Sequence, residues 1–119
     1  EAVVSQGIVV TKAALRAADR LGVTARMLSA VIGVSEATIS RMRREEFMLE
    51  HGSKPFELAV LFTRLFRSLD AIAGGDETVS RAWLKSENSA LGGVPLERIL
   101  TVTGLVDAIA YLDTRRALV

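Results

Sequence analysis

Residues 25–44 read ARMLSAVIGVSEATISRMRR, and this stretch decides the fold. Its apolar residues recur at helical spacing on both sides of a three-residue turn over residues 33–35. Gly33 can adopt the left-handed backbone conformation that such a turn requires, and Ser35 is a typical N-cap for the second helix. The residues expected to lock the two helices together are Leu28, Ile32, Val34, Ile39 and Met42. The pattern predicts a helix-turn-helix whose second helix spans residues 36 to about 46.

The outward face of this second helix combines small and basic side chains. A rotation of about 100° per residue places them opposite the buried Ile39. Small residues allow a close approach to base edges, and arginine can pair with guanine or with phosphate. The start of the helix, with the Ser35 hydroxyl, can also bind a backbone phosphate. The candidate DNA-binding residues are Arg26, Ser35, Glu36, Ala37, Thr38, Ser40, Arg41 and Arg44. The alternative is an ordinary helical hairpin with solvated arginines.

The distribution of charge favours DNA binding over that alternative. The 119-residue chain has 15 basic and 14 acidic side chains, a net charge of +1. Residues 11–44 contain seven basic and two acidic side chains, a net charge of +5, whereas residues 45–119 contain eight and eleven, a net charge of −3. Non-specific affinity for DNA comes largely from neutralising phosphates. The acidic remainder predicts a second module with a partner of its own.

The composition argues against several classes of function. The chain has no cysteine, which removes disulfides, thiol catalysis and cysteine-ligated zinc. His51 is the single histidine and stands in a polar loop, so a multi-histidine metal site is excluded within one chain. Neither glycine pair has the strand and lysine of a phosphate-binding loop, and no Gly-x-Ser-x-Gly elbow occurs. We therefore expect a protein that is not an enzyme and that uses no cofactor or metal.

The same reading predicts a cytoplasmic protein with no membrane partner. The longest uncharged runs have about ten residues, fewer than the ~18 that span a bilayer. The first residues also lack the basic segment of a secretory signal.

Helical periodicity continues through the rest of the chain, and no alternating run is long enough to predict a strand. Further helices are expected before Gly22, from Pro55 to about Ala73, after an Asp76 cap, from Pro95, and up to about Thr114. Thr103 and Gly104 are expected to break the last two helices apart. The predicted fold class is therefore all-α.

Three regions are expected from this pattern. Residues 1–10 have no clear period and are predicted to form an N-terminal arm. The helix-turn-helix module is expected over residues 11–50, and a small helical domain over residues 55–119. Phe62 and Phe66 lie on the long helix of that domain, which is expected to be a core helix rather than a dimer interface.

A second motif lies in the C-terminal half. It consists of Trp83-Leu84, Asn88, Leu91-Gly92-Gly93, Pro95-Leu96, Leu100 and Gly104, in this order over about twenty residues. Asn88 can bond the freed backbone of a turn, Gly92 and Gly93 permit unusual dihedral angles, and Pro95 can begin a helix. Trp83, Leu91 and Leu96 are expected to serve the turn and the core more than a partner surface.

Two resemblances follow from these motifs. The stretch from Leu28 to Arg41 resembles the Xre/Cro-type helix-turn-helix, although Ala25 stands where that family often has Gln and Met42-Arg43 where it often has Trp-Glu. The second motif resembles the toxin-binding domain of MbcA/ParS/Xre antitoxins. Together they cover roughly residues 11–116. This resemblance implies a type II antitoxin that blocks a RES-domain toxin, an NAD-degrading enzyme, and that represses its own operon.

The resemblance also implies a toxin-binding set and partners. The candidate toxin-binding residues are Trp83, Asn88, Leu91, Gly92, Gly93, Pro95, Leu96, Arg115 and Arg116. Arg115 and Arg116 can either cap the last helix or enter an anion pocket built for a dinucleotide. The expected partners are a RES-domain toxin, operator DNA and a second copy, in a homodimer or a larger toxin–antitoxin complex. A plain transcriptional regulator whose C-terminal half only dimerises, or a pure interaction module, are the alternatives.

Overall fold

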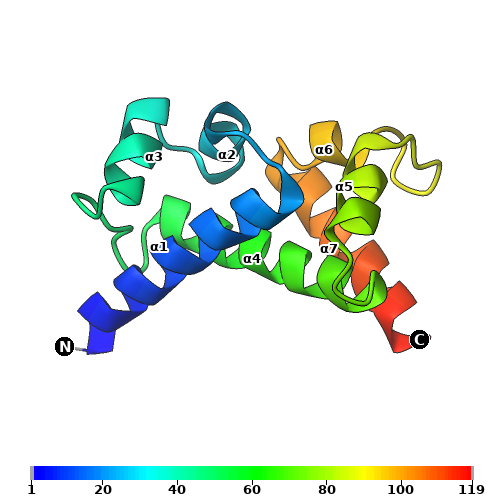
Figure 1. The fold of residues 1–119 in the computed structure, drawn as a ribbon, viewed down its shortest axis with the longest axis horizontal. Helices are drawn as coiled ribbons and strands as arrows, with labels where there is room; N and C mark the ends of the chain where they lie inside the picture. Colours follow the sequence, from blue (N-terminus) through cyan, green and yellow to red (C-terminus); the bar gives the residue numbers. More distant parts are fainter. Residues whose placement is uncertain (1, 119) are drawn as a thin grey trace. The chain divides into compact units, whose positions relative to one another are not determined.

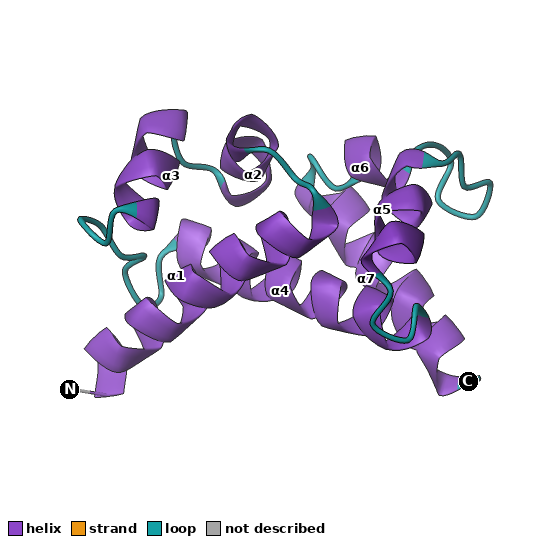
Figure 2. Ribbon diagram, in the orientation of Figure 1, coloured by secondary structure: helices purple, strands orange, loops and turns teal. Residues whose placement is uncertain are grey.

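The computed structural model describes residues 2–118, and every regular element in that range is an α-helix (Figures 1 and 2). The helices are α1 (Ala2–Leu21), α2 (Ala25–Ile32), α3 (Glu36–Arg43), α4 (Lys54–Ile72), α5 (Glu77–Lys85), α6 (Pro95–Arg98) and α7 (Val102–Ala117). The predicted all-α class is confirmed. None of the helices in residues 2–118 is long and apolar enough to cross a membrane.

The chain divides into two compact units, which we call the N-unit, up to Thr63, and the C-unit, from Arg64 onward. The division falls inside α4 and not in the loop before it, where the sequence suggested a boundary. The reason is that the apolar stripe of α4 continues past the division: Phe62 and Leu65 are both fully buried. One helix therefore contributes to both cores.

In the N-unit, α2 and α3 form the predicted helix-turn-helix. The Thr24 hydroxyl oxygen accepts a hydrogen bond from the Met27 amide at 3.2 Å, and Ser35 caps α3 in the same way through the Thr38 amide at 3.0 Å. Gly33 ends α2 with φ of 77°, the left-handed conformation expected from the sequence. The fully buried Leu28, Ile32 and Ile39 belong to these two helices, so local caps and apolar burial both support the predicted motif.

The expected N-terminal arm over residues 1–10 is wrong for residues 2–10, because α1 begins at Ala2 and includes them; Glu1 lies outside the described residues. Gly7 is buried there, and a Cβ atom at this position would lie 2.6 Å from the Leu49 carbonyl oxygen. The Thr11 hydroxyl donates to the Gly7 carbonyl at 2.7 Å and accepts from the Leu49 amide at 2.9 Å. The irregular segment after α3 thus crosses α1 at this point. The buried positions at this crossing are Gly7 and Thr11, and neither is a large apolar residue. The sequence of this part of α1 therefore shows no apolar helical period.

In the C-unit, a tight turn joins α5 to α6. The Asp76 carboxylate caps the start of α5, as predicted, by accepting from the Thr78 amide at 2.9 Å. The turn closes through two backbone bonds between Asn88 and Gly93, of 2.9 and 3.1 Å. The Asn88 side chain accepts from the Leu91 amide at 3.2 Å, which confirms its predicted role in bonding the turn backbone.

Gly104 does not break the last helix. It is the third residue of α7, and its amide donates to the capping Thr101 hydroxyl at 3.0 Å. A Cβ atom at this position would lie 1.8 Å from the Arg98 carbonyl oxygen. The glycine is therefore required by a close backbone approach and not by a left-handed turn.

Candidate functional sites

The first candidate site is the outward surface of α3. Apart from the buried Ile39 and Met42, this helix is open to solvent. Of the predicted DNA-binding residues, Thr38 is half-buried and the others are exposed. Arg26 lies on α2, and the remaining seven lie on α3 or at its two ends. The structure therefore leaves the predicted recognition surface open.

Ser35 and Thr38 have a structural task at this site. The Ser35 hydroxyl oxygen accepts from the Thr38 amide, and the two hydroxyls lie 2.9 Å apart. Their polar atoms are thus already engaged with each other, which fixes the start of α3. Both hydroxyls therefore have a structural role at the start of α3.

The end of α3 differs from the predicted end near Glu46. The last helical residue is Arg43, and the chain reverses at Glu45, the only non-glycine residue among residues 2–118 with a positive φ, of 60°. The Glu46 amide donates to the Arg41 carbonyl at 2.8 Å, and the Glu45 amide donates to the Met42 carbonyl at 3.1 Å. This pair of bonds is a Schellman motif, in which the left-handed position is usually glycine.

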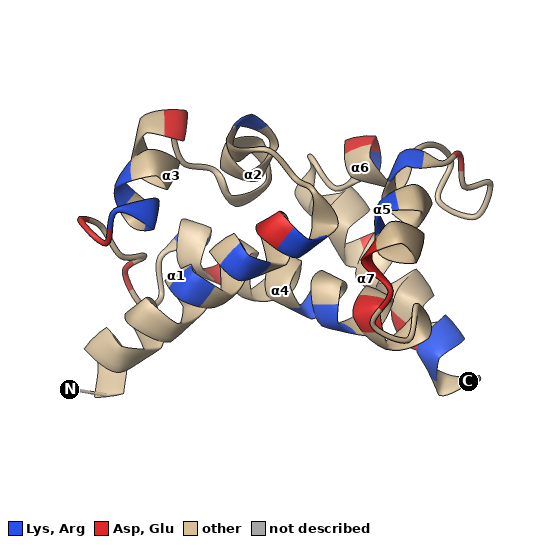
Figure 3. Ribbon diagram, in the orientation of Figure 1, with Lys and Arg blue, Asp and Glu red and all other residues tan. Residues whose placement is uncertain are grey.

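The residues of this turn contact three basic side chains. Glu45 pairs with Lys12 of α1 at 3.5 Å, and Glu46 pairs with the Arg44 Nε at 3.1 Å. Phe47 lies below the Arg41 guanidinium, whose carbon is 5.0 Å from the ring centroid. We call residues 45–47 the clamp turn. Figure 3 shows its acidic residues next to the basic end of α3.

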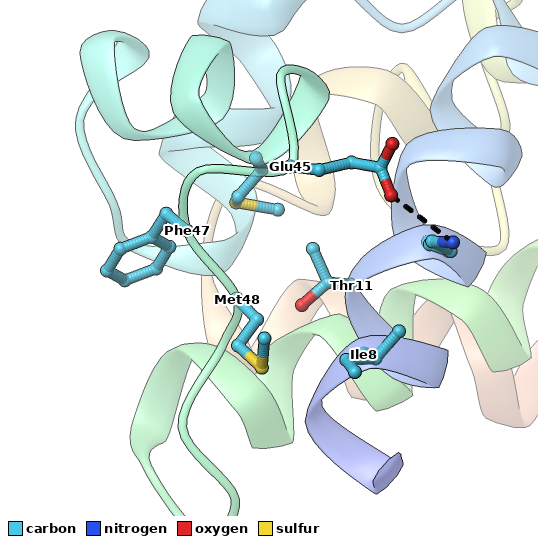
Figure 4. Close-up of a pocket in the computed structure, with 7 residues that line it drawn as sticks. Ile8, Thr11, Glu45, Phe47 and Met48 are labelled. Atoms are coloured by element: carbon cyan, nitrogen blue, oxygen red, sulfur yellow. Dashed lines mark ion pairs between the residues drawn. The ribbon is translucent and has the colours of Figure 1, made fainter. Parts of the chain in front are cut away.

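A small cavity lies between the clamp turn and α1. It has a volume of about 200 Å³ and is lined by Ile8, Thr11, Lys12, Met42, Glu45, Phe47 and Met48. Figure 4 shows Glu45 directed across the cavity toward α1, while the Phe47 ring points away from α1. The clamp turn therefore contacts α1 through Glu45, and it contacts the arginines at the end of α3 through Glu46 and Phe47.

Arg43 points from α3 toward α1. Its two terminal nitrogens donate to the Asp19 carboxylate of α1 at 2.9 and 3.3 Å. A bidentate pair of this kind fixes the guanidinium plane. Arg43 thus joins α3 to α1, and Arg41 and Arg44 remain as the arginines of the outward face.

The structure changes the interpretation of the charge pattern. The N-unit, with Glu1 included, contains eight basic and seven acidic side chains, and the C-unit contains seven of each, so their net charges are +1 and 0. The contrast of +5 against −3 depended on a division at residue 44, just before Glu45 and Glu46. The C-unit is therefore not acidic. The basic character is local and belongs to the surfaces of α1 and α3.

The second candidate site is in the C-unit, where the structure separates the motif into two groups. Leu91 and Pro95 are buried, and Trp83, Asn88, Gly93 and Leu96 are half-buried. The exposed members are Gly92, Arg115 and Arg116. Most of the second motif therefore builds the turn and core, as the sequence indicated for Trp83, Leu91 and Leu96.

Arg115 is stacked on aromatic rings. Its guanidinium carbon lies 5.9 Å from the Tyr111 ring centroid, and Tyr111 stacks on Trp83 at 6.3 Å with an interplanar angle of 21°. Sequence reasoning missed Tyr111. The available signal was its position four residues before Arg115, which puts the two side chains on one face of a helix. This row of three side chains ends at an exposed cation.

Arg116 has different surroundings. It donates to the Ser68 hydroxyl at 3.5 Å, and Ser68 donates to the Asp113 carboxylate at 2.8 Å. Arg64 donates to the other Asp113 oxygen. The hydrogen bond from Ser68 is the main cause that holds the pKa of Asp113 below its ordinary value; partial burial opposes this shift and Arg64 reinforces it. Arg116 therefore belongs to a polar network that ties α7 to the second half of α4.

Across residues 2–118, no group of three histidine, aspartate or glutamate side chains is placed to hold a metal ion. Each surface presents one arginine above an aromatic ring, Arg41 over Phe47 and Arg115 over Tyr111. A second arginine in each surface is hydrogen-bonded to a polar side chain, Arg44 to Glu46 and Arg116 to Ser68. Such groups recognise anions and partner surfaces.

Comparison with known protein families agrees with this arrangement. Residues 2–64 match the model of the antitoxin Xre-like helix-turn-helix domain. Residues 68–117 match the model of the antitoxin Xre/MbcA/ParS C-terminal toxin-binding domain. A search of curated proteins found no match. The two matched ranges meet within α4, close to the division between the units, and on this evidence the chain belongs to the family of Xre/MbcA/ParS antitoxins.

Proposed function

We propose that this antitoxin has two activities: its C-unit binds and blocks a RES-domain toxin that degrades NAD, and its N-unit represses its own operon by binding operator DNA. The observation that carries the proposal is the presence, in one chain, of an open helix-turn-helix surface and a toxin-binding domain with an exposed, ring-supported arginine. On this proposal the chain acts by binding, without cofactor or metal, in the cytoplasm where operator and toxin are found.

The DNA contact that we propose places α3 in the major groove. In a helix-turn-helix the N-terminal residues of the second helix read base edges, and here those positions are Glu36, Ala37 and Ser40, followed by Arg41. Arg41 would bind guanine through two donors, and Arg44 would bind a phosphate. Because such proteins read two half-sites, we propose that the repressing species is a homodimer or a larger toxin–antitoxin complex.

The toxin contact that we propose centres on Arg115. Its guanidinium rests on Tyr111 and leaves its donors directed to solvent, whereas Arg116 is bonded to Ser68. A dinucleotide-binding pocket commonly contains a carboxylate that bonds the ribose hydroxyls. A guanidinium presented on a helix can pair bidentately with such a carboxylate and so occupy the pocket. Trp83 supports this arginine through Tyr111 and does not itself need to contact the toxin.

The direct test uses the purified product of the gene beside this chain's gene, which we expect to be a RES-domain protein. NAD remaining after incubation is measured with and without an equimolar amount of this chain. We expect consumption of NAD to stop when the chain is added. Undiminished consumption at that ratio would overturn the toxin-blocking function. If the same preparation still binds its promoter, the alternative of a plain transcriptional regulator would then be correct.

A further inference from the structure

We propose that the clamp turn, residues 45–47, sets the state of the two outward arginines of α3: Phe47 orients Arg41 for a base, and Glu46 competes with DNA for Arg44. This inference rests on the proposed DNA binding. It assigns roles to two residues that lie outside the helix-turn-helix stretch. Phe47 is a positioning residue in this scheme, because it acts through Arg41.

The clamp turn has a defined backbone conformation. Two hydrogen bonds close it, from the Glu45 amide to the Met42 carbonyl and from the Glu46 amide to the Arg41 carbonyl. Glu45 has a φ of 60°, the conformation in which a Schellman motif normally has glycine, so its backbone is strained. Its carboxylate also meets the Lys12 ammonium of α1 at 3.5 Å. These contacts place Glu46 and Phe47 beside the end of α3.

The Arg41 guanidinium lies over the Phe47 ring, with its carbon 5.0 Å from the ring centroid. A cation stacked on an aromatic ring interacts through the face of the guanidinium, and its N–H donors point outward in the guanidinium plane. Those in-plane donors are the ones that pair with guanine O6 and N7. Among residues 2–118 no carboxylate lies within ion-pair distance of Arg41. Phe47 therefore restrains the long side chain without occupying its donors.

Arg44 differs from Arg41 because it is paired with a carboxylate. Its Nε donates to the Glu46 carboxylate at 3.1 Å, so one of the donors that a phosphate would use is already occupied. Both side chains are 57% exposed, which makes the pair weak and open to exchange. Phosphate must displace a carboxylate that then stays near the DNA and repels it. Glu46 should thus lower the affinity for any DNA sequence, without a preference among bases.

The experiment uses the full chain and a duplex from the promoter of its own operon. Binding is measured for wild type, Phe47→Leu, Arg41→Ala and the double variant, on this duplex and on versions with single base changes. Phe56→Leu is the matched control, because Phe56 is also a half-buried ring of the N-unit and contacts His51 at 5.0 Å.

We expect Phe47→Leu to weaken binding about two- to five-fold, which corresponds to an exposed cation–π contact. The loss should be confined to the duplex with the native base at one position, and should vanish in the Arg41→Ala background. Phe47→Trp keeps an aromatic ring at this position and should bind as tightly as wild type. Phe56→Leu should also bind as tightly as wild type. An equal loss with and without Arg41, or no loss in Phe47→Leu, would overturn the role of Phe47.

Glu46→Gln tests the other half of the proposal and does not depend on how Phe47→Leu folds. We expect tighter binding to all duplexes, with a steeper dependence on salt because one more phosphate is neutralised. Unchanged or weaker binding would overturn the role of Glu46. If wild type itself binds no promoter duplex, the proposed DNA binding fails; if wild type binds and the variants are neutral, only the clamp turn is refuted.

Discussion

The N-unit and the C-unit each present an arginine above an aromatic ring, but they support it differently. Arg41 lies over Phe47, which comes from an irregular turn held by a strained backbone. Arg115 lies over Tyr111 of its own helix, and the ring is stacked on Trp83 of α5. The first arrangement depends on one turn keeping its conformation. The second depends on helix geometry and on packing inside the C-unit.

This difference shows where each surface is sensitive to change. In the N-unit, the contacts of the outward arginines come from residues two and six positions later in the chain, so local substitutions should alter them without affecting the core. In the C-unit, the ring below Arg115 is stacked on Trp83, which is half-buried. A change at Trp83 should alter stability and partner binding together.

Gly104→Ala should destabilise the protein by about 3 kcal/mol or more, because the added methyl group would meet the Arg98 carbonyl at 1.8 Å and backbone atoms cannot move aside. Gly33→Ala should cost about 1 kcal/mol, since its φ of 77° is unfavourable but the added methyl group would make only an ordinary contact, with the Leu58 side chain at 3.9 Å. Urea unfolding of both variants measures the difference. Equal costs would show that the methyl group at position 104 avoids the Arg98 carbonyl.

Arg41→Ala and Arg115→Ala should have separate effects. Arg41→Ala should lose about 1–3 kcal/mol of base discrimination and leave the block of NAD consumption intact. Arg115→Ala should lose about 2 kcal/mol of toxin affinity, as expected for an arginine at the centre of an interface, and leave promoter binding intact. Arg16→Ala and Arg67→Ala, both exposed, are the matched controls in the two units. A crossed effect would contradict the division of labour between the surfaces.

Glu45→Gly should stabilise the N-unit by about 0.5–1 kcal/mol, because glycine accepts the left-handed conformation without strain. The lost ion pair with Lys12 is exposed and offsets little of this gain. Thermal unfolding measures the stability, and the promoter duplex measures binding. We expect higher stability with little change in binding, because the hydrogen bonds that close the turn are made by the backbone. A destabilised variant would show that the ion pair outweighs the strain.

Asp113→Asn should have the smallest effect, below about 1 kcal/mol at neutral pH, because the carboxylate is partly exposed. The pKa of Asp113 is lowered in the folded chain, so its contribution is complete above the unfolded pKa, near 4, and is lost as the pH falls through the folded value. Wild type and variant should therefore differ in stability at pH 7 and converge below the folded pKa. A constant difference down to low pH would contradict this linkage.

The elements found from the sequence are those set by near neighbours. Thr24, Gly33, Ser35 and Asp76 act on backbone atoms two to four residues away, so their identity alone predicts the helix ends. Gly7 and Gly104 could not be interpreted in the same way. Their hydrogen atoms face the Leu49 and Arg98 carbonyls, and no sequence spacing reveals such a contact. This is why the N-terminal half of α1 and the start of α7 were mispredicted.

The candidate sites were predictable to a similar extent. The outward residues of α3 follow from helical rotation, and they are exposed as expected. Phe47 and Tyr111 were missed, because an aromatic residue shows its partner only after the chain is folded. The charge pattern misled in part, since Glu45 and Glu46 lie just beyond the basic segment and contact Lys12 and Arg44.

Because the division falls inside α4, no loop separates the N-unit from the C-unit. Cutting the chain between Thr63 and Arg64 would leave new helix ends, whose backbone N–H and C=O groups have lost their helical partners. Residues on both sides of that point, Phe62 and Leu65, are fully buried. A protease should therefore cleave the loops before α4 and after it sooner than α4 itself.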